Sequence, residues 1–279
     1  MNETSNGFEN FTSKKEKNVL RTIFYDSENS DSSDSDNSFI SNQGKEKKNL
    51  ECPIVAFTSE ITGFEFQLIE DVKKGISSQL WPASKFLCKY FDENTQIIDI
   101  YLDNQSTLIE LGAGVGLCGI YLSSLGFKNS VLTDLPEAIP LLSKNIELNR
   151  TKCKGSINAT PLSWGDAEAI KIIVKENVLN SKESPLIIAS DCVYWECLFT
   201  PFYNTLYTFV VEMGCIAYIS HIKRWKKDQK FFVMCKKFMN VEVVKEVIEY
   251  IKDEESIHSS DNKLRRQISR VYKISSKLI

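Results

Sequence analysis

The sequence predicts an α/β fold built on a mostly parallel sheet, and three observations lead to this prediction. Residues 107–120 have the pattern of an apolar strand, a turn of closely spaced glycines and the start of an apolar helix. Strand-like and helix-like segments then alternate along the chain, as in a doubly wound sheet. The last two strand-like segments, 241–247 and 267–274, have no clear helix between them, so we expect the terminal strand to be antiparallel.

The turn after the first of these strands carries glycines in two overlapping spacings. Gly114-x-Gly116-x-x-Gly119 matches the spacing of dinucleotide-binding proteins. Glu110-x-Gly112-x-Gly114-x-Gly116 instead resembles the turn of class I methyltransferases, which use S-adenosylmethionine (SAM). Glycines let a ligand approach the backbone closely, and the next helix presents free N–H groups at its start. Both spacings therefore predict a nucleotide-like ligand, and an ordinary tight turn is the alternative.

Asp134 follows the apolar strand expected at residues 130–133. A carboxylate at the end of the second strand of such a sheet is placed to accept hydrogen bonds from ribose hydroxyls. Asp191 follows another apolar strand, at residues 186–190, and begins an acid-x-x-Tyr step that ends at Tyr194. Because both acids follow strands of one parallel sheet, we expect them at the same edge of it.

The other elements are predicted from apolar periodicity and from proline and glycine positions. We expect further strands at residues 53–59, 64–69, 160–163 and 215–220. We expect helices at residues 82–91, 117–125, 134–148, 167–178, 198–210 and 229–239. Asn145 and Asn149 are expected to cap a helix or to face solvent. The basic run 221–227 is expected to be a solvated helix start, with contact to an acidic substrate surface as the alternative.

Composition narrows the class of protein. The chain has 279 residues and a formal net charge of −3, so no strongly basic balance indicates nucleic acid as a partner. No apolar run approaches the roughly 20 residues that span a bilayer, and the N-terminus lacks an apolar signal core. The 8 cysteines form no CxxC pair, and there are only 2 histidines, so we expect reduced thiols and no metal site. We therefore expect a monomer located in the cytoplasm, with the nucleus as the alternative.

The N-terminal residues 1–50 differ from the rest of the chain. They are rich in Ser, Asn, Lys, Asp and Glu, and the run 27–38 alternates serine with acids and asparagine. Such a segment buries too little apolar area to fold, so we expect a disordered tail followed by one domain at residues 51–279. The serines beside acids are also candidate sites for acid-directed kinases.

Four short motifs occur in a fixed order along the chain: Trp-Pro-Ala from Trp81, Glu-Leu-Gly-Ala-Gly from Glu110, Trp-Gly from Trp164 and Asp-x-x-Tyr from Asp191. In this respect the sequence resembles the seven-strand SAM-dependent methyltransferases, in particular the methyltransferase-like 21 group of protein-lysine methyltransferases, over roughly residues 55–275. The resemblance implies a Rossmann-like seven-strand methyltransferase sheet with helices on both faces, a terminal antiparallel strand and a short N-terminal β extension.

The resemblance also implies a role for each residue of the site. The methionine part of SAM would be held by Glu110, Gly112, Ala113 and Gly114, and its ribose by Asp134. The cofactor pocket would be lined by Trp81, Trp164 and Ser190. Asp191 and Tyr194 would be the catalytic residues, which orient the acceptor amine. Other interpretations of these side chains are a core aromatic for Trp81, a tryptophan closing the sheet edge for Trp164 and a helix cap for Asp191.

The sequence therefore predicts an enzyme that transfers a methyl group from SAM to a protein side chain, most simply the Nε of lysine. The protein substrates that the resemblance implies are chaperones, an AAA ATPase or translation factors, with no membrane or nucleic-acid partner. Two other functions remain open at this point. The dinucleotide spacing allows an NAD-dependent oxidoreductase, and intact motifs alone do not exclude a non-catalytic interaction module with the same fold.

Overall fold

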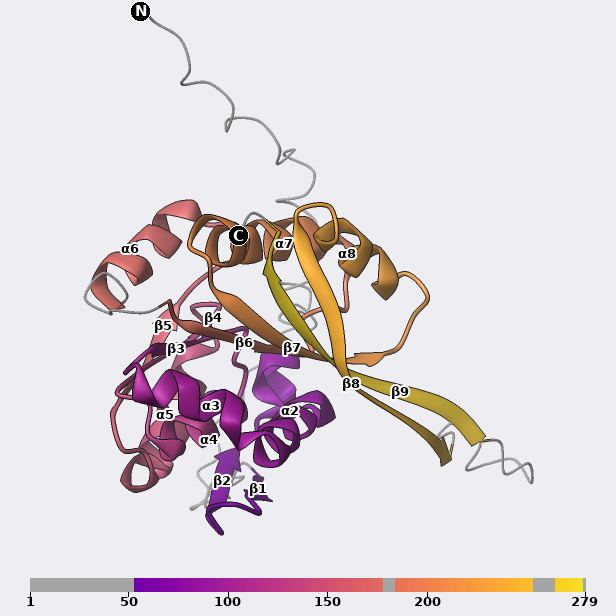
Figure 1. Cartoon of the computed structure of the whole chain (residues 1–279). Helices are drawn as coiled ribbons and strands as arrows, with labels where there is room; N and C mark the ends of the chain where they lie inside the picture. Colours follow the sequence, from indigo (N-terminus) through magenta and orange to yellow (C-terminus); the bar gives the residue numbers. More distant parts are fainter. Residues whose placement is uncertain (1–52, 178–183, 253–263, 278–279) are drawn as a thin grey trace, which may run out of the picture. The chain divides into compact units, whose positions relative to one another are not determined.

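The computed structural model describes residues 53–177, 184–252 and 264–277 (Figure 1). The predicted tail at residues 1–50 lies outside the described residues, and so does most of the charged segment between the last two strands. The strands are β1 Ile54–Thr58, β2 Glu65–Ile69, β3 Thr107–Leu111, β4 Asn129–Asp134, β5 Ser156–Pro161, β6 Leu186–Ser190, β7 Ile216–Lys223, β8 Met239–Lys252 and β9 Leu264–Ser276. The α-helices are α2 Pro82–Glu93, α3 Thr95–Asp103, α4 Leu117–Leu125, α5 Ile139–Leu148, α6 Ala167–Asn177, α7 Phe199–Tyr207 and α8 Asp228–Cys235.

Seven of these strands form one sheet in the order β5-β4-β3-β6-β7-β9-β8. The pairs from β5 to β7 are all parallel, whereas β9 is antiparallel to both β7 and β8. The first two strands form a separate antiparallel hairpin. The predicted mostly parallel sheet, its antiparallel strand and the N-terminal β extension are therefore confirmed.

The inner parallel strands β3, β4 and β6 are buried on both faces because each face is covered by helices. Along β6, Leu186 and Ile188 belong to one hydrophobic core, and Ile187 and Ala189 to the other. Alternate side chains of a strand point to opposite faces, so a continuous apolar run is what this position requires. In Figure 1, α6, α7 and α8 cover one face of the sheet, and α2, α3, α4 and α5 lie on the other.

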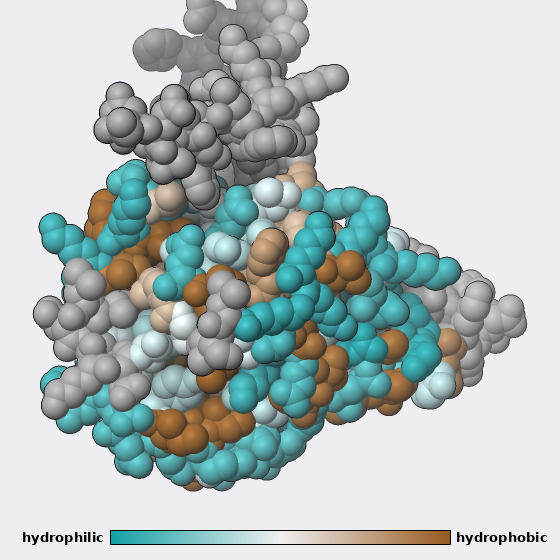
Figure 2. Space-filling view, turned by 45° about the horizontal axis from the view of Figure 1, so that its top comes forward, coloured by the Kyte–Doolittle hydropathy of each residue, from teal (hydrophilic) through white to brown (hydrophobic). Residues whose placement is uncertain are grey.

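Helix α4 is buried along nearly its whole length, from Leu117 to Ser124. It is apolar all round because it contacts β3 and β4 on one side and α2 on another. On the surface drawn in Figure 2, hydrophobic residues form small patches separated by hydrophilic ones. In the described part of the chain, no helix has the length and apolar character needed to cross a membrane.

Helix α3 was not expected from the sequence, and the bounds of several other elements differ from the prediction. The third parallel strand lies at Ser156–Pro161, earlier than expected, because it is the outer strand of the sheet and five of its six residues are at least partly exposed in an irregular pattern. Helix α5 begins at Ile139 and not at Asp134, whose carboxylate accepts the Leu135 N–H in a turn. Strand β7 continues to Lys223 because it pairs with β9 as far as Ile268, so the basic run begins in a strand.

The expectation that Asn145 and Asn149 cap a helix or face solvent is wrong for Asn145, whereas Asn149 is the C-terminal cap of α5. Both are fully buried, and their amides bind the outer side of β2. Asn149 exchanges hydrogen bonds with the backbone N–H and C=O of Gln67, at 3.1 and 2.7 Å. Asn145 does the same with Ile69, at 2.8 and 3.1 Å, and also donates to the C=O of Val115 in the glycine turn, at 3.0 Å. Helix α5 and its C-terminal cap thus hold the β1–β2 hairpin through two side-chain amides, Asn145 and Asn149, which are about one helical turn apart.

Asn145→Ala should lower the free energy of unfolding by about 2–4 kcal/mol, because three buried backbone groups of Ile69 and Val115 lose their partner. Urea unfolding followed by circular dichroism measures the change. Lys144→Ala removes an exposed side chain from the same helix and should change stability by less than about 0.5 kcal/mol. Equal stability of the two variants would contradict this role of the Asn145 amide.

Candidate active site

The glycine turn joins β3 to α4 at the carboxyl end of the central strand. Gly112 has a φ of +65°, and an added Cβ there would lie 2.8 Å from both Trp164 Cζ2 and Cys192 Sγ. A larger residue would meet these side chains and would also be strained at this φ. The Ala113 N–H donates to Thr133 O at 2.9 Å, which ties the turn to the end of β4. The backbone itself therefore forms the wall of the site here.

Glu110 lies at the base of this turn and is fully buried. Its Oε2 accepts the backbone N–H of Gly119 in α4 at 2.9 Å. An added Cβ at Gly119 would lie 2.5 Å from that same oxygen, so only glycine lets the helix approach this closely. Burial raises the pKa of Glu110 to about 8, although the Gly119 N–H acts in the opposite direction.

Asp134 closes the neighbouring strand and is 8% exposed. Its Oδ2 accepts the Gly114 N–H at 2.6 Å, and its Oδ1 accepts the Leu135 N–H at 2.7 Å. Burial raises the pKa of this carboxyl to about 6, against the lowering effect of the two N–H donors. The structure thus brings Asp134 and the glycine turn into direct contact, as the sequence predicted for two parts of one site.

The two predicted tryptophans lie on different sides of the turn. Trp81 is the residue before α2, and its Nε1–H donates to Ile76 O at 2.9 Å. Trp164 follows β5 and packs against Phe202 of α7, with ring centroids 4.5 Å apart. Both side chains are half-buried. Trp164 is adjacent to Gly112, whereas Trp81 is near the end of β7.

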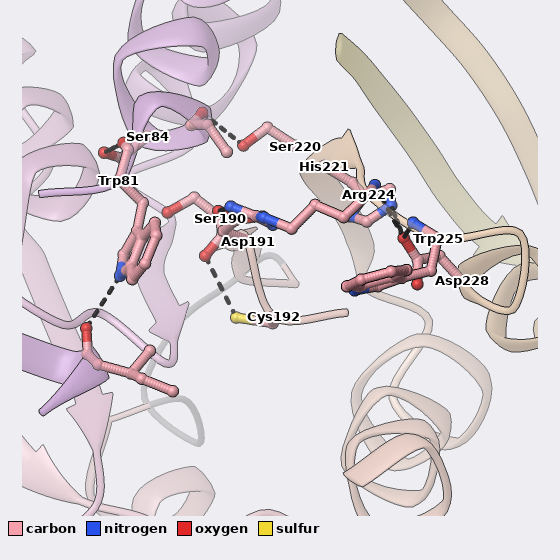
Figure 3. Close-up of polar contacts among 12 residues, drawn as sticks. Trp81, Ser84, Ser190, Asp191, Cys192, Ser220, His221, Arg224, Trp225 and Asp228 are labelled. Atoms are coloured by element: carbon pink, nitrogen blue, oxygen red, sulfur yellow. Dashed lines mark hydrogen bonds and ion pairs between the residues drawn. The ribbon is translucent and has the colours of Figure 1, made fainter. Parts of the chain in front are cut away.

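Asp191 and Arg224 form a bidentate ion pair at the ends of β6 and β7 (Figure 3). The two guanidinium nitrogens donate to Oδ1 at 2.6 Å and to Oδ2 at 2.5 Å. The Asp191 side chain is 5% exposed and that of Arg224 is 30% exposed. Asp191 also has a φ of +59°, a conformation that is uncommon outside glycine. Asp191 is therefore not a helix cap, because its carboxylate pairs with a side chain 33 residues away.

Arg224 makes two further contacts. Its guanidinium carbon lies 5.4 Å from the ring centroid of Trp81, within the range of a cation–π interaction. Its backbone N–H donates to Asp228 Oδ2 at 3.1 Å, and the same oxygen accepts the Trp225 N–H at 3.0 Å. Ser220, within β7, donates to Ala83 O at 2.7 Å and so joins this strand to α2.

Asp228 is fully buried beneath this turn, and His221 Nε2 lies 3.3 Å from its Oδ2. Burial acts to raise the pKa of Asp228, but the interaction with His221 and the N–H groups of Trp225 and Arg224 outweigh it and lower the pKa. The expected solvated helix start at residues 221–227 is therefore wrong for its first four residues, which belong to β7 and to this ion-paired corner. Trp225, Lys226 and Lys227 are exposed.

Tyr194, the second predicted catalytic residue, is half-buried and packs against Trp195, with ring centroids 5.1 Å apart. Burial raises the pKa of its phenol, and the acids Cys192, Asp134 and Asp191 act in the same direction. The side chain is therefore a neutral hydroxyl at physiological pH. The chain between Asp191 and Trp195 is not helical, so no helical turn brings Asp191 and Tyr194 to one face.

Sequence reasoning missed three residues of this site: Cys192, Arg224 and Asp228. The buried Cys192 thiol donates to Leu111 O at 3.3 Å and supports the glycine turn from below. In the sequence, Arg224 is one of several basic residues in the run 221–227. That run, which follows an apolar strand, could have suggested that a basic residue pairs with Asp191. It could not have shown that this residue is Arg224 and not Lys223 or Lys226.

The residues fit a sulfonium nucleoside. Within the described residues, Glu110 Oε1 is buried without a hydrogen-bond partner, and this oxygen can accept an ammonium donor when the carboxyl gives up its proton on binding. Asp134 has lone pairs beyond the two that it uses, which suits hydroxyl donors. In the same part of the chain, no group of three His, Cys, Asp or Glu side chains is arranged to hold a metal ion.

The sheet order and the acid–glycine turn after its central strand define a seven-strand methyltransferase fold. A dinucleotide-binding sheet has six parallel strands, and the antiparallel β9 departs from that arrangement. The profile of the lysine methyltransferase family matches residues 61–238. The chain therefore belongs to the lysine methyltransferase family, and it is an enzyme that transfers a methyl group to lysine.

Individual relatives agree with this family. The chain is 29% identical over 185 residues to the protein-lysine N-methyltransferase EFM6 of Saccharomyces cerevisiae. This matched region covers 61% of this chain and 73% of the relative. It is 40% identical over 91 residues to the EEF1A lysine methyltransferase 3 of Xenopus tropicalis, which covers 33% of this chain and 38% of that relative. Among solved structures, TYW2 of P. horikoshii is 14% identical to the chain with a TM-score of 0.44, and the match covers 80% of this chain and 71% of that structure.

Glu110→Gln should change how stability depends on pH. The raised pKa means that the folded protein keeps a proton on Glu110 between about pH 4.5 and about pH 8, where the unfolded chain has lost it. This stabilisation is complete below pH 4.5 and is lost as the pH rises to 8. Between pH 6 and 8 the wild type should lose about 1.4 kcal/mol per pH unit more than the variant.

Urea unfolding at several pH values between 6 and 8 measures the two slopes. Asp134 ionises at about pH 6, so it contributes little in this window. Parallel slopes for the wild type and Glu110→Gln would contradict a raised pKa at this position.

Proposed function

We propose that this protein transfers a methyl group from SAM to the side-chain nitrogen of a lysine in another protein, with the glycine turn, Asp134 and Asp191 as the centre of its active site. The observation that carries the proposal is the buried, unpartnered oxygen of Glu110 beside that turn, in a chain of the lysine methyltransferase family. Nothing in the fold or the comparisons favours the NAD-dependent oxidoreductase.

The chain offers a set of groups for each part of the cofactor. Glu110 Oε1 accepts from the ammonium of the methionine part, which lies along the backbone of Gly112, Ala113 and Gly114. Asp134 accepts from the ribose hydroxyls, since its two present donors leave lone pairs free. Trp81, Trp164 and Ser190 line the pocket around it; an indole face suits contact with a purine ring.

Asp191 and Tyr194 orient the acceptor. When bound, SAM supplies a methyl carbon on a sulfonium: the lysine Nε lone pair forms the new N–C bond, the C–S electron pair stays on sulfur, and the amine proton goes to solvent. The free lysine has a pKa of about 10.4, so the chain must favour its neutral form. The half-buried Tyr194 and Trp195 rings give the acceptor a poorly solvated wall, which disfavours the ammonium. Alignment by Asp191 lowers the barrier further.

The substrate is proposed to be a protein, and a name carried by one relative suggests a first candidate. That relative is called EEF1A lysine methyltransferase 3, so EEF1A is the first acceptor to test. We also infer a monomer in the cytoplasm, with the nucleus as the alternative; light scattering and a fluorescent fusion test these two points.

Incubation of the purified protein with tritiated SAM and a cell extract should label at least one protein, with the label on lysine. Asp191→Asn should reduce labelling more than tenfold, because the acceptor loses its orienting carboxylate, while the variant still binds S-adenosylhomocysteine. Scintillation counting after gel separation measures this. Label only in RNA or small molecules would refute a protein substrate, and no label despite cofactor binding would indicate a non-catalytic module.

Asp134→Asn should weaken the affinity for S-adenosylhomocysteine about tenfold, because a charged acceptor for the ribose hydroxyls is replaced by a neutral one. Isothermal titration calorimetry measures this affinity. Glu137→Gln is the matched control: it removes a carboxylate that is exposed and nearby, and should change the affinity less than about twofold. If the two variants bind equally, Asp134 does not hold the ribose.

A further inference from the structure

We propose that Arg224 is a positioning residue for methyl transfer, which fixes the Asp191 carboxylate and cancels its charge where the acceptor amine approaches. The inference rests on the proposed role of Asp191 at the acceptor site. It addresses a conflict in that role: a bare carboxylate would orient the amine but would also stabilise its ammonium form, which cannot accept a methyl group.

Arg224 is held from three directions, which indicates that it stays in place. Its guanidinium donates to both oxygens of Asp191 at 2.5 and 2.6 Å, and it lies over the ring of Trp81. Its backbone N–H is held by the buried Asp228 carboxylate at 3.1 Å. A fork-to-fork pair of this kind fixes the plane of the carboxylate as well as its position. Figure 3 shows the guanidinium extending from the end of β7 to Asp191.

Asp191 needs such a partner in the folded protein. Its side chain is 5% exposed, and an unpaired carboxylate at that depth is strongly unfavourable. Several acids act on this corner: Asp134 from the end of β4, Cys192 and Tyr194 from the following loop, and Asp228, which lies beyond the guanidinium and is itself paired with His221. Loss of Arg224 would therefore leave the Asp191 carboxylate without its ion-pair partner, close to these acids.

The pair can still serve the acceptor. A carboxylate has about four lone-pair positions, and the guanidinium occupies two. The remaining ones can accept an N–H of the incoming amine. Because Asp191 and Arg224 together have no net charge, this hydrogen bond orients the amine without the full Coulomb attraction that would keep it protonated. Arg224 thus acts through Asp191 and does not itself contact the reacting atoms.

The alternative is that Arg224 is a placeholder, which leaves Asp191 when the substrate lysine arrives. Its three anchors argue against this. Removal of a placeholder should also raise activity, whereas removal of a positioning residue should lower it, and the two predictions therefore differ in sign.

Arg224→Met, Arg224→Lys and the wild type should be compared through the pH dependence of kcat. The acceptor is the protein that forms the most strongly labelled band in the tritiated-SAM experiment. It is purified and supplied at a saturating concentration. In Arg224→Met the rising limb of the profile should move about one unit to higher pH, so that the rate below the limb falls about tenfold. Arg224→Lys restores the charge and should return the limb close to its wild-type position. Lys237→Met, which removes an exposed charge elsewhere, should leave the profile unchanged.

Two results would overturn the proposal: an unmoved limb in Arg224→Met, or a higher rate with a lower KM at all pH values. The double variant Asp191→Asn, Arg224→Met isolates the pair, because without the Asp191 charge the loss of Arg224 should not move the limb further. If Asp191→Asn alone keeps full activity, the proposed acceptor site fails, and this outcome is distinct from a failure of Arg224.

Urea unfolding gives a readout that needs no acceptor. Arg224→Met should destabilise the protein, and adding Asp191→Asn should recover part of that loss, because the buried carboxylate is then neutral. Losses that simply add would show that the two side chains are not coupled and would also overturn the inference. Calorimetry with S-adenosylhomocysteine should give the same affinity for each variant.

Discussion

The hydrogen bond from the Gly119 N–H to the Glu110 carboxylate is the interaction on which this site depends. It joins the central strand to the helix that follows, and the missing Cβ of Gly119 is what allows the two to approach. The glycine turn is closed between these two anchors and is tied to β4 through Asp134. A buried acid is costly to ionise, yet here it organises the backbone and leaves one oxygen for a ligand.

The second half of the site follows from the neighbouring strand pair. Ser190, the last residue of β6, is directly opposite Ser220 of β7, and β7 continues for three residues to Lys223. Arg224 therefore follows β7 beyond the end of β6, and its long side chain reaches back to Asp191. Asp191 and Arg224 meet at this edge of the sheet, and the Ser220 hydroxyl binds the start of α2, which follows Trp81. The proposed cofactor residues thus follow β3 and β4, and the proposed acceptor residues follow β6 and β7. Because β3 and β6 are neighbours in the sheet, the two groups of residues lie side by side.

Much of the fold could be predicted because local signals agree with it. The glycine turn, Pro82 at a helix start and the apolar run of β6 each require one kind of structure. Helix α3 was missed, although Ile97, Ile98, Tyr101 and Leu102 keep helical spacing. The partner of Asp191 could not be predicted, because a pair separated by 33 residues depends on strand register and on where β7 ends. The burial of Asn145 likewise depends on a strand far away in the sequence.

The amides of α5 also determine what the outer edge of the β1–β2 hairpin can do. Each of the two outer edges of a two-stranded ribbon carries a row of outward peptide groups, and an open row can recruit a further chain. On the β2 edge, the outward N–H and C=O groups of Gln67 and Ile69 already have side-chain partners. A further strand therefore cannot pair with these two residues, and their amide protons should exchange slowly with water although they lie outside the main sheet.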